Sequence, residues 1–162
     1  MTNVIKVGMA DLNTVTAPNR IRTTGLGSCV GIVLYDPVTR IGGMAHIMLP
    51  SSEMVRVGKI NKAKYADTAI PLLLDEMTNL GAKKGLIIAK IAGGAQMFQF
   101  QSQNDMMRIG PRNVEATKET LKKLGISIVA EDTGGNFGRT IELDTLSGIL
   151  YIRTVNKGVQ EI

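Results

Sequence analysis

"CVGIVLYDPVTRIGGMAHIML" (residues 29–49) contains two apolar runs that a turn signal separates. The first run, residues 29–35, is rich in β-branched side chains and leads into DPVT, a combination typical of a β-turn. The second run, residues 41–49, is stopped by Pro50. Two such runs joined by a short turn predict a β-hairpin.

Shorter strand-like runs precede and follow this hairpin. Each is bounded by turn residues or glycine, and they cover residues 4–9, 19–24, 85–94, 126–132, 139–144 and 148–154. Residues 51–61 read as an irregular loop. The chain is therefore expected to be rich in short strands.

Two segments, residues 67–80 and 112–124, have helical periodicity, and a glycine follows each of them. Pro71 is tolerated only in the first turn of a helix, which favours a start near Asp67. Many strands with two helices inserted late indicate an α+β fold, in which the helices cover one face of a sheet.

Length and composition indicate one soluble domain over residues 1–162. The chain is 44% hydrophobic and 20% charged, and it contains no apolar run long enough to span a bilayer. A single cysteine cannot form an internal disulfide, and no secretory signal is apparent, so a cytoplasmic location is expected. The net charge of +5 is scattered and is not accompanied by a nucleic-acid motif, so an acidic protein partner fits it at least as well.

The only cysteine, Cys29, and the only histidine, His46, lie on the two strands of the predicted hairpin. Counting from the turn, Cys29 opposes a residue close to position 47, within one or two residues of register. A thiol attacks only as thiolate, so it needs a base or a cation nearby. The hairpin thus predicts a thiolate–imidazolium pair suited to attack on a carbonyl carbon.

The stretch GLGS (25–28) lies directly before Cys29 and presents backbone amides with little side-chain bulk. Gly27 and Ser28 are the candidates for holding an oxyanion or orienting the substrate. A third group usually orients the imidazole, and Thr23 and Thr24 are both candidates. An inert buried cysteine and a core histidine are about as well supported by this pattern. A metal site is disfavoured because one histidine and one cysteine are too few soft ligands.

Three further segments carry weaker signals. Residues 91–98 and 131–140 are glycine-rich but lack a phosphate-binding pattern, so tight turns beside strands explain them best. Residues 97–107 mix phenylalanine, glutamine and methionine, and form either a solvated loop or an adaptable protein-contact loop.

The successive stretches TTGLGSCVGIVLYDP, GGMAHIMLP, KYADTAI, KIAGGAQMF, IGPRNV and AEDTGGNFGRT resemble the motifs of the CheD family, the chemoreceptor glutamine deamidases of bacterial chemotaxis. The resemblance runs from about Val4 to Thr154. It implies hydrolysis of glutamine side chains to glutamate on methyl-accepting chemotaxis receptors, without a cofactor. It also implies a three-layer α/β/β sandwich like that of the cytotoxic necrotizing factors.

The resemblance places the nucleophile on Cys29, the histidine on His46 and the third residue on Thr23, which acts through its hydroxyl or its main-chain carbonyl. It further implies a CheC-type phosphatase as a partner, for which Phe98 and Phe100 are candidate contacts. Two other functions compete with hydrolysis through a thioester. The first is a non-enzymatic adaptor that binds receptors and the phosphatase. The second is a redox-sensing thiol, which ranks last because the chain has no second cysteine to form a disulfide with Cys29.

Overall fold

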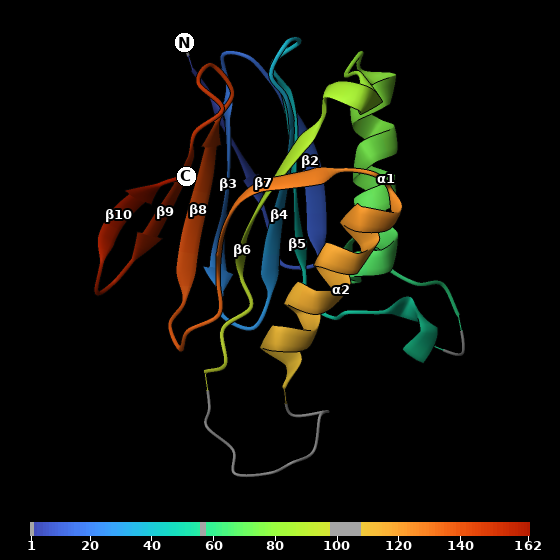
Figure 1. Ribbon diagram of the computed structural model, residues 1–162, viewed down its shortest axis with the longest axis vertical. Coiled ribbons are helices and arrows are strands. Elements are labelled where there is room, and N and C mark those ends of the chain that lie inside the picture. The colour runs from blue at the N-terminus through green and yellow to red at the C-terminus, as the bar shows by residue number, and fades with distance from the viewer. Residues whose placement is uncertain (1, 56–57, 98–107) are drawn as a thin grey trace.

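The described part of the chain forms three layers, with a helical layer, a central sheet and an outer sheet (Figure 1). The computed structural model describes residues 2–55, 58–97 and 108–162. Its helices α1 (Ala66–Asn79) and α2 (Ile109–Lys123) cover one face of the central sheet, and the outer sheet covers the other. The α+β class expected from the sequence is confirmed.

The central sheet has the strand order β2-β5-β4-β6-β7, and the outer sheet has the order β1-β3-β8-β9-β10. The central strands are β2 (Asp11–Thr16), β4 (Val30–Asp36), β5 (Ile41–Ile47), β6 (Ile88–Gly93) and β7 (Ser127–Thr133). The outer strands are β1 (Val4–Val7), β3 (Arg20–Leu26), β8 (Arg139–Asp144), β9 (Leu150–Thr154) and β10 (Gly158–Glu161).

The predicted hairpin forms the middle of the central sheet. Strands β4 and β5 pair antiparallel, with Val30 opposite Ile47 and Gly31 opposite His46. Every residue of both strands is buried, because helices cover one face of this sheet and a second sheet covers the other. Both sheets are mixed, since β1 pairs parallel with β3 and β6 pairs parallel with β7.

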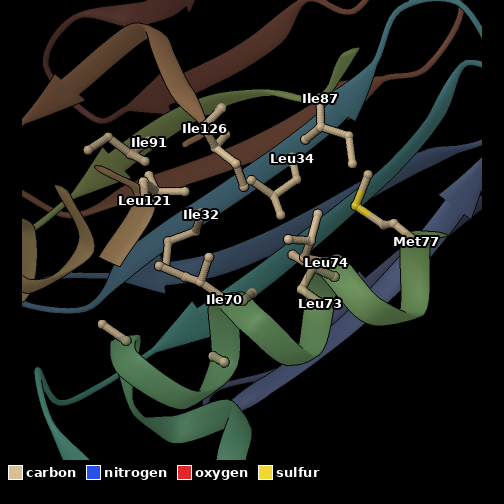
Figure 2. Packing of buried hydrophobic residues seen from close by; sticks show 14 of the residues in the cluster. Ile32, Leu34, Ile70, Leu73, Leu74, Met77, Ile87, Ile91, Leu121 and Ile126 are labelled. Carbon is tan, nitrogen blue, oxygen red and sulfur yellow. The ribbon is translucent and has the colours of Figure 1, made fainter. Parts of the chain in front are cut away.

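Side-chain alternation along β4 divides the core into two clusters. Ile32 and Leu34 point toward the helices, where Figure 2 shows Ile32 near Ile70 of α1 and Leu34 above Leu73 and Leu74. Cys29 and Val33 belong to the cluster between the two sheets. Each fully buried aliphatic side chain stabilises the fold by about 1.5–3 kcal/mol, so the two clusters hold the layers in fixed register.

The edges of the sheets differ from the sequence-based expectation. Strands β2 and β10 were not predicted, because their residues are largely exposed at sheet edges and give little apolar periodicity. Strand β1 ends at Val7 rather than at residue 9, because Ala10 turns the chain with a φ of 55°. The expected loop, residues 51–61, contains a short 3₁₀ turn at Ser52–Met54, and a second one at Lys62–Lys64 directly follows it.

Both helices differ from their predicted form at the N-terminal end. Helix α1 begins at Ala66, so Pro71 lies beyond the first turn, where it deprives the helix of one hydrogen bond. The burial of Ile70, Leu73 and Leu74 around it offsets that loss. Helix α2 begins at Ile109, three residues before the predicted start at 112, because Pro111 fits the first turn. Neither helix, nor any other among the described residues, could cross a membrane.

Candidate active site

The candidate site lies at the end of the sheets where β4 begins and β5 ends. Gly31 is paired with His46, so Cys29, two residues earlier on the same face, is a diagonal neighbour of the histidine. Diagonal neighbours have Cβ atoms roughly 7–8 Å apart or somewhat less, within reach of long side chains. The register places Cys29 opposite Met48 by extension, one residue from the predicted position 47. Both side chains face the outer sheet.

Thr23, on β3 of the outer sheet, reaches the imidazole across the gap between the layers. Its Oγ1 lies 2.7 Å from Nδ1 of His46 and 2.7 Å from the carbonyl oxygen of Val7. The hydroxyl has a single proton and donates it to the carbonyl, which can only accept. Thr23 must therefore accept from Nδ1–H, and this fixes the imidazole tautomer with an unprotonated Nε2. Thr24 is exposed and faces away from the histidine.

Nε2 of His46 is buried, and it has no hydrogen-bond partner among the described residues. His46 itself is 0% exposed. An unpaired buried acceptor is costly, and in native proteins such groups are often reserved for function. The lone pair of Nε2 is available to take a proton from a neighbouring thiol.

Burial determines the protonation states of this pair. It raises the pKa of the Cys29 thiol, an effect opposed in part by a hydrogen bond from the cysteine's own backbone N–H. It lowers the pKa of the His46 imidazole. Both shifts favour the neutral forms. Burial therefore favours a neutral resting pair of thiol and imidazole over the thiolate–imidazolium pair predicted from the sequence.

The turn before Cys29 is held by backbone hydrogen bonds to the segment that follows β6. The amide of Ala95 donates to the carbonyl of Gly27 over 2.9 Å, and the amide of Gly94 donates to the carbonyl of Cys29 over 2.8 Å. Within the described ranges, the backbone N–H groups of Ser28 and Cys29 donate to no other residue. These two amides lie beside the sulfur and donate to no other described residue, so they are suited to stabilise an oxyanion.

Two glycines allow this close contact. Gly93 has a φ of +110°, and a Cβ built on it would overlap the carbonyl oxygen of Cys29. A Cβ on Gly94 would collide with Val114 of α2. For residues 91–98 the sequence favoured tight turns, with lining of the site entrance as a second option. The structure places Gly93 and Gly94 of this segment directly against Cys29 and α2.

Arg139 supports the same segment and was not identified from the sequence. It is 3% exposed, its Nε lies 3.2 Å from Oδ2 of Asp132, and its Nη1 donates to the carbonyl of Gly93. A buried arginine needs such partners, because an unpaired buried charge is strongly unfavourable. The motif AEDTGGNFGRT supplies both members of this ion pair, which is the signal that could have indicated it.

The remaining predicted contact residues lie at the edge of the described structure. Gly27 and Ser28 are half-buried beside Cys29, and the side chain of Met97 lies against Gly27. Phe98 and Phe100 lie outside the described residues. In the described ranges, no group of three or more histidine, cysteine or acidic residues could hold a metal ion.

Comparison with known proteins relates this arrangement to a family. The model of the family described as CheD chemotactic sensory transduction matches residues 48–154. A protein of Halalkalibacterium halodurans, a chemoreceptor glutamine deamidase CheD, is 60% identical over 162 residues, the whole of both chains. The chain belongs to the CheD family.

Other CheD relatives extend the match over nearly the whole chain. The chemoreceptor glutamine deamidase CheD of Bacillus subtilis is 51% identical over 98% of this chain and 96% of its own length. A probable CheD of Geobacillus kaustophilus is 54% identical over the same shares. Thr23, Cys29 and His46 precede the residues that the family model matches, whereas the match to the Halalkalibacterium CheD includes them.

Proposed function

We propose that this CheD-family chain, as one domain over residues 1–162, deamidates glutamine side chains of methyl-accepting chemotaxis receptors, using Cys29, His46 and Thr23. The curated relatives are named chemoreceptor glutamine deamidases, and they match the chain at 50–60% identity. The single observation that carries the residue assignment is the bond between Thr23 and Nδ1 of His46. This bond leaves Nε2 unprotonated and able to act as a base, and the His46 side chain lies on the same face of the central sheet as Cys29.

The first half of the reaction forms a thioester. Nε2 of His46 takes the thiol proton as the sulfur of Cys29 attacks the amide carbon, which forms a C–S bond. The oxygen of the tetrahedral intermediate accepts from the backbone amides of Ser28 and Cys29. His46 then returns its proton to the amide nitrogen, the C–N bond breaks, and ammonia leaves.

The second half releases glutamate. A water molecule attacks the thioester carbonyl and gives a proton to Nε2 of His46. The C–S bond breaks, the sulfur recovers the proton, and the receptor side chain leaves as a carboxylic acid that ionises. Every step uses protein groups and water, so the proposed reaction needs no cofactor.

The proposal includes a cytoplasmic location, which a chain with one unpaired cysteine fits. It also includes a CheC-type phosphatase as partner, which the resemblance of the motifs implies. The three-layer arrangement also resembles, in our proposal, the sandwich of the cytotoxic necrotizing factors. A receptor helix is a large substrate. It fits a site at the end of the sheets, where several turns meet, better than a deep pocket.

The experiment that tests the function is mass spectrometry of receptor fragments after incubation with the protein. Conversion of glutamine to glutamate adds about one dalton, and we expect this gain with the wild type and not with Cys29→Ala. If no receptor fragment gains mass while receptors and phosphatase still bind, the chain is an adaptor and the proposed hydrolysis is wrong.

A further inference from the structure

Asn113 is a buried polar residue that the mechanism has not yet used. It lies on α2, it is 0% exposed, and its side-chain amide reaches the gap between two strand ends. Nδ2 donates to the carbonyl of Ser28 over 2.9 Å and to the carbonyl of Met48 over 3.0 Å. One carbonyl lies immediately before Cys29, and the other lies two residues after His46. A single amide group therefore ties the cysteine turn to the histidine strand.

The orientation of the Asn113 amide follows from its partners. Both are carbonyl oxygens, which only accept, so the nitrogen must face them and spend both of its protons. Oδ1 faces the other way, buried and without a partner among the described residues. Asn113 thus pairs both of its N–H groups with the two carbonyls, while its own oxygen stays unpaired within the described ranges. This arrangement indicates that its role is to hold these carbonyls.

The carbonyl of Ser28 belongs to the same peptide group as the N–H of Cys29. A trans peptide is planar, and its C=O and N–H point in opposite directions. Fixing the Ser28 oxygen on Asn113 therefore fixes the direction of the Cys29 N–H. Donation to the oxygen also polarises the peptide, which makes its N–H a stronger donor.

Two glycines bring α2 close enough for this contact. A Cβ on Gly110, in the first turn of α2, would overlap the backbone of Ala95 and crowd that of Gly94. A Cβ on Gly94 would meet the carbonyl of Gly110 as well as Val114. The start of the helix therefore lies directly on the segment that supports Cys29, and Asn113 projects from there.

We infer that Asn113 is a positioning residue that orients and polarises the Ser28–Cys29 peptide as the oxyanion donor of the cysteine site. This inference rests on the proposed cysteine mechanism. It predicts a large loss in the steps that build negative charge on oxygen, and a much smaller loss in the reactivity of the sulfur, whose pKa the same N–H lowers only in part.

The test compares Asn113→Ala and Asn113→Asp with Thr117→Val. Thr117 is the matched control, because it lies one turn further along α2, is 0% exposed, and has a buried hydroxyl without a partner among the described residues. Each variant is assayed for deamidation of a receptor fragment and for alkylation of Cys29 by iodoacetamide. Alkylation displaces iodide at a saturated carbon and forms no oxyanion.

We expect kcat to fall about 10- to 100-fold in both Asn113 variants, near the effect of losing one oxyanion donor. KM should stay within about twofold of wild type, the alkylation rate should fall far less than kcat, and Thr117→Val should keep the wild-type kcat. If Asn113→Ala or Asn113→Asp fails to fold, Asn113→Ser is used in its place. Wild-type kcat in the Asn113 variants, equal losses in Thr117→Val, or alkylation that falls in parallel with kcat would each overturn the inference. Turnover by Cys29→Ala would instead refute the proposed mechanism itself.

Discussion

The hydroxyl of Thr23 lies 2.7 Å from Nδ1 of His46, and it joins the outer sheet to the central sheet at the candidate site. Because the same hydroxyl donates to Val7, the threonine acts as an acceptor toward the ring. The position of the basic nitrogen is thus set by a residue of the other sheet.

Replacing Thr23 by valine should remove the acceptor while keeping the shape of the side chain. The imidazole would then be free to adopt the other tautomer, and kcat should fall by roughly 10²-fold, at the lower end of general-base contributions. Thr24→Val is the matched control, since Thr24 is exposed and should tolerate the change. Steady-state deamidation of a receptor fragment measures both. Equal losses in the two variants would contradict the assignment.

Ultraviolet titration of the thiolate can measure the protonation state of Cys29 directly, because the chain has one cysteine. Burial raises the pKa of this thiol above its ordinary value of 9.0. The midpoint of thiolate absorbance in the wild type minus Cys29→Ala difference spectrum should therefore lie above pH 9.0. Thiolate already present at neutral pH would show a preformed ion pair and contradict the neutral resting state.

The stability of the fold should decrease on the acid side because His46 is buried in its neutral form. Its pKa is lowered from the ordinary 6.5, so below pH 6.5 the unfolded chain binds a proton that the folded chain does not. The free energy of unfolding should decline as the pH falls through this window, and the decline should be smaller in His46→Gln. Urea unfolding at several pH values measures this difference, and identical pH profiles would be inconsistent with it.

Replacing Gly93 by alanine should disturb the contact beneath the nucleophile. The substitution combines a positive φ with overlap on the carbonyl of Cys29, so stability should fall by at least about 2 kcal/mol and turnover should fall with it. Gly125→Ala is the control, because Gly125 also has a positive φ but open space around it. It should cost about 1–2 kcal/mol and keep wild-type turnover. Full activity in Gly93→Ala would contradict the proposed support.

The hairpin and the placement of Cys29 and His46 could be predicted from sequence, since they depend on local signals. Two apolar runs and one turn set the pairing, and strand alternation set the shared face. The choice between Thr23 and Thr24 depended on which face of β3 meets the central sheet. Ile21, two residues before Thr23, is buried on the same face of β3. This face can be assigned to the interior only when the arrangement of the layers is known.

Other parts of the site could not be predicted because they depend on contacts between distant segments. Asn113 looks like an ordinary polar residue on a helix, and only the tertiary structure places it on the carbonyl of Ser28. The glycine at 93 reads as a turn residue until its neighbour, Cys29, is known. Edge strands β2 and β10 gave little signal, since most of their side chains face solvent.

Acid quenching of the reaction, followed by intact-protein mass spectrometry, tests the central claim most directly. A receptor peptide containing a target glutamine is mixed with the protein and stopped during turnover. The account predicts an adduct equal to the peptide less one ammonia, located on Cys29, and Cys29→Ala should yield neither adduct nor deamidated peptide. Deamidation by Cys29→Ala at the wild-type rate would show that the sulfur is not the nucleophile.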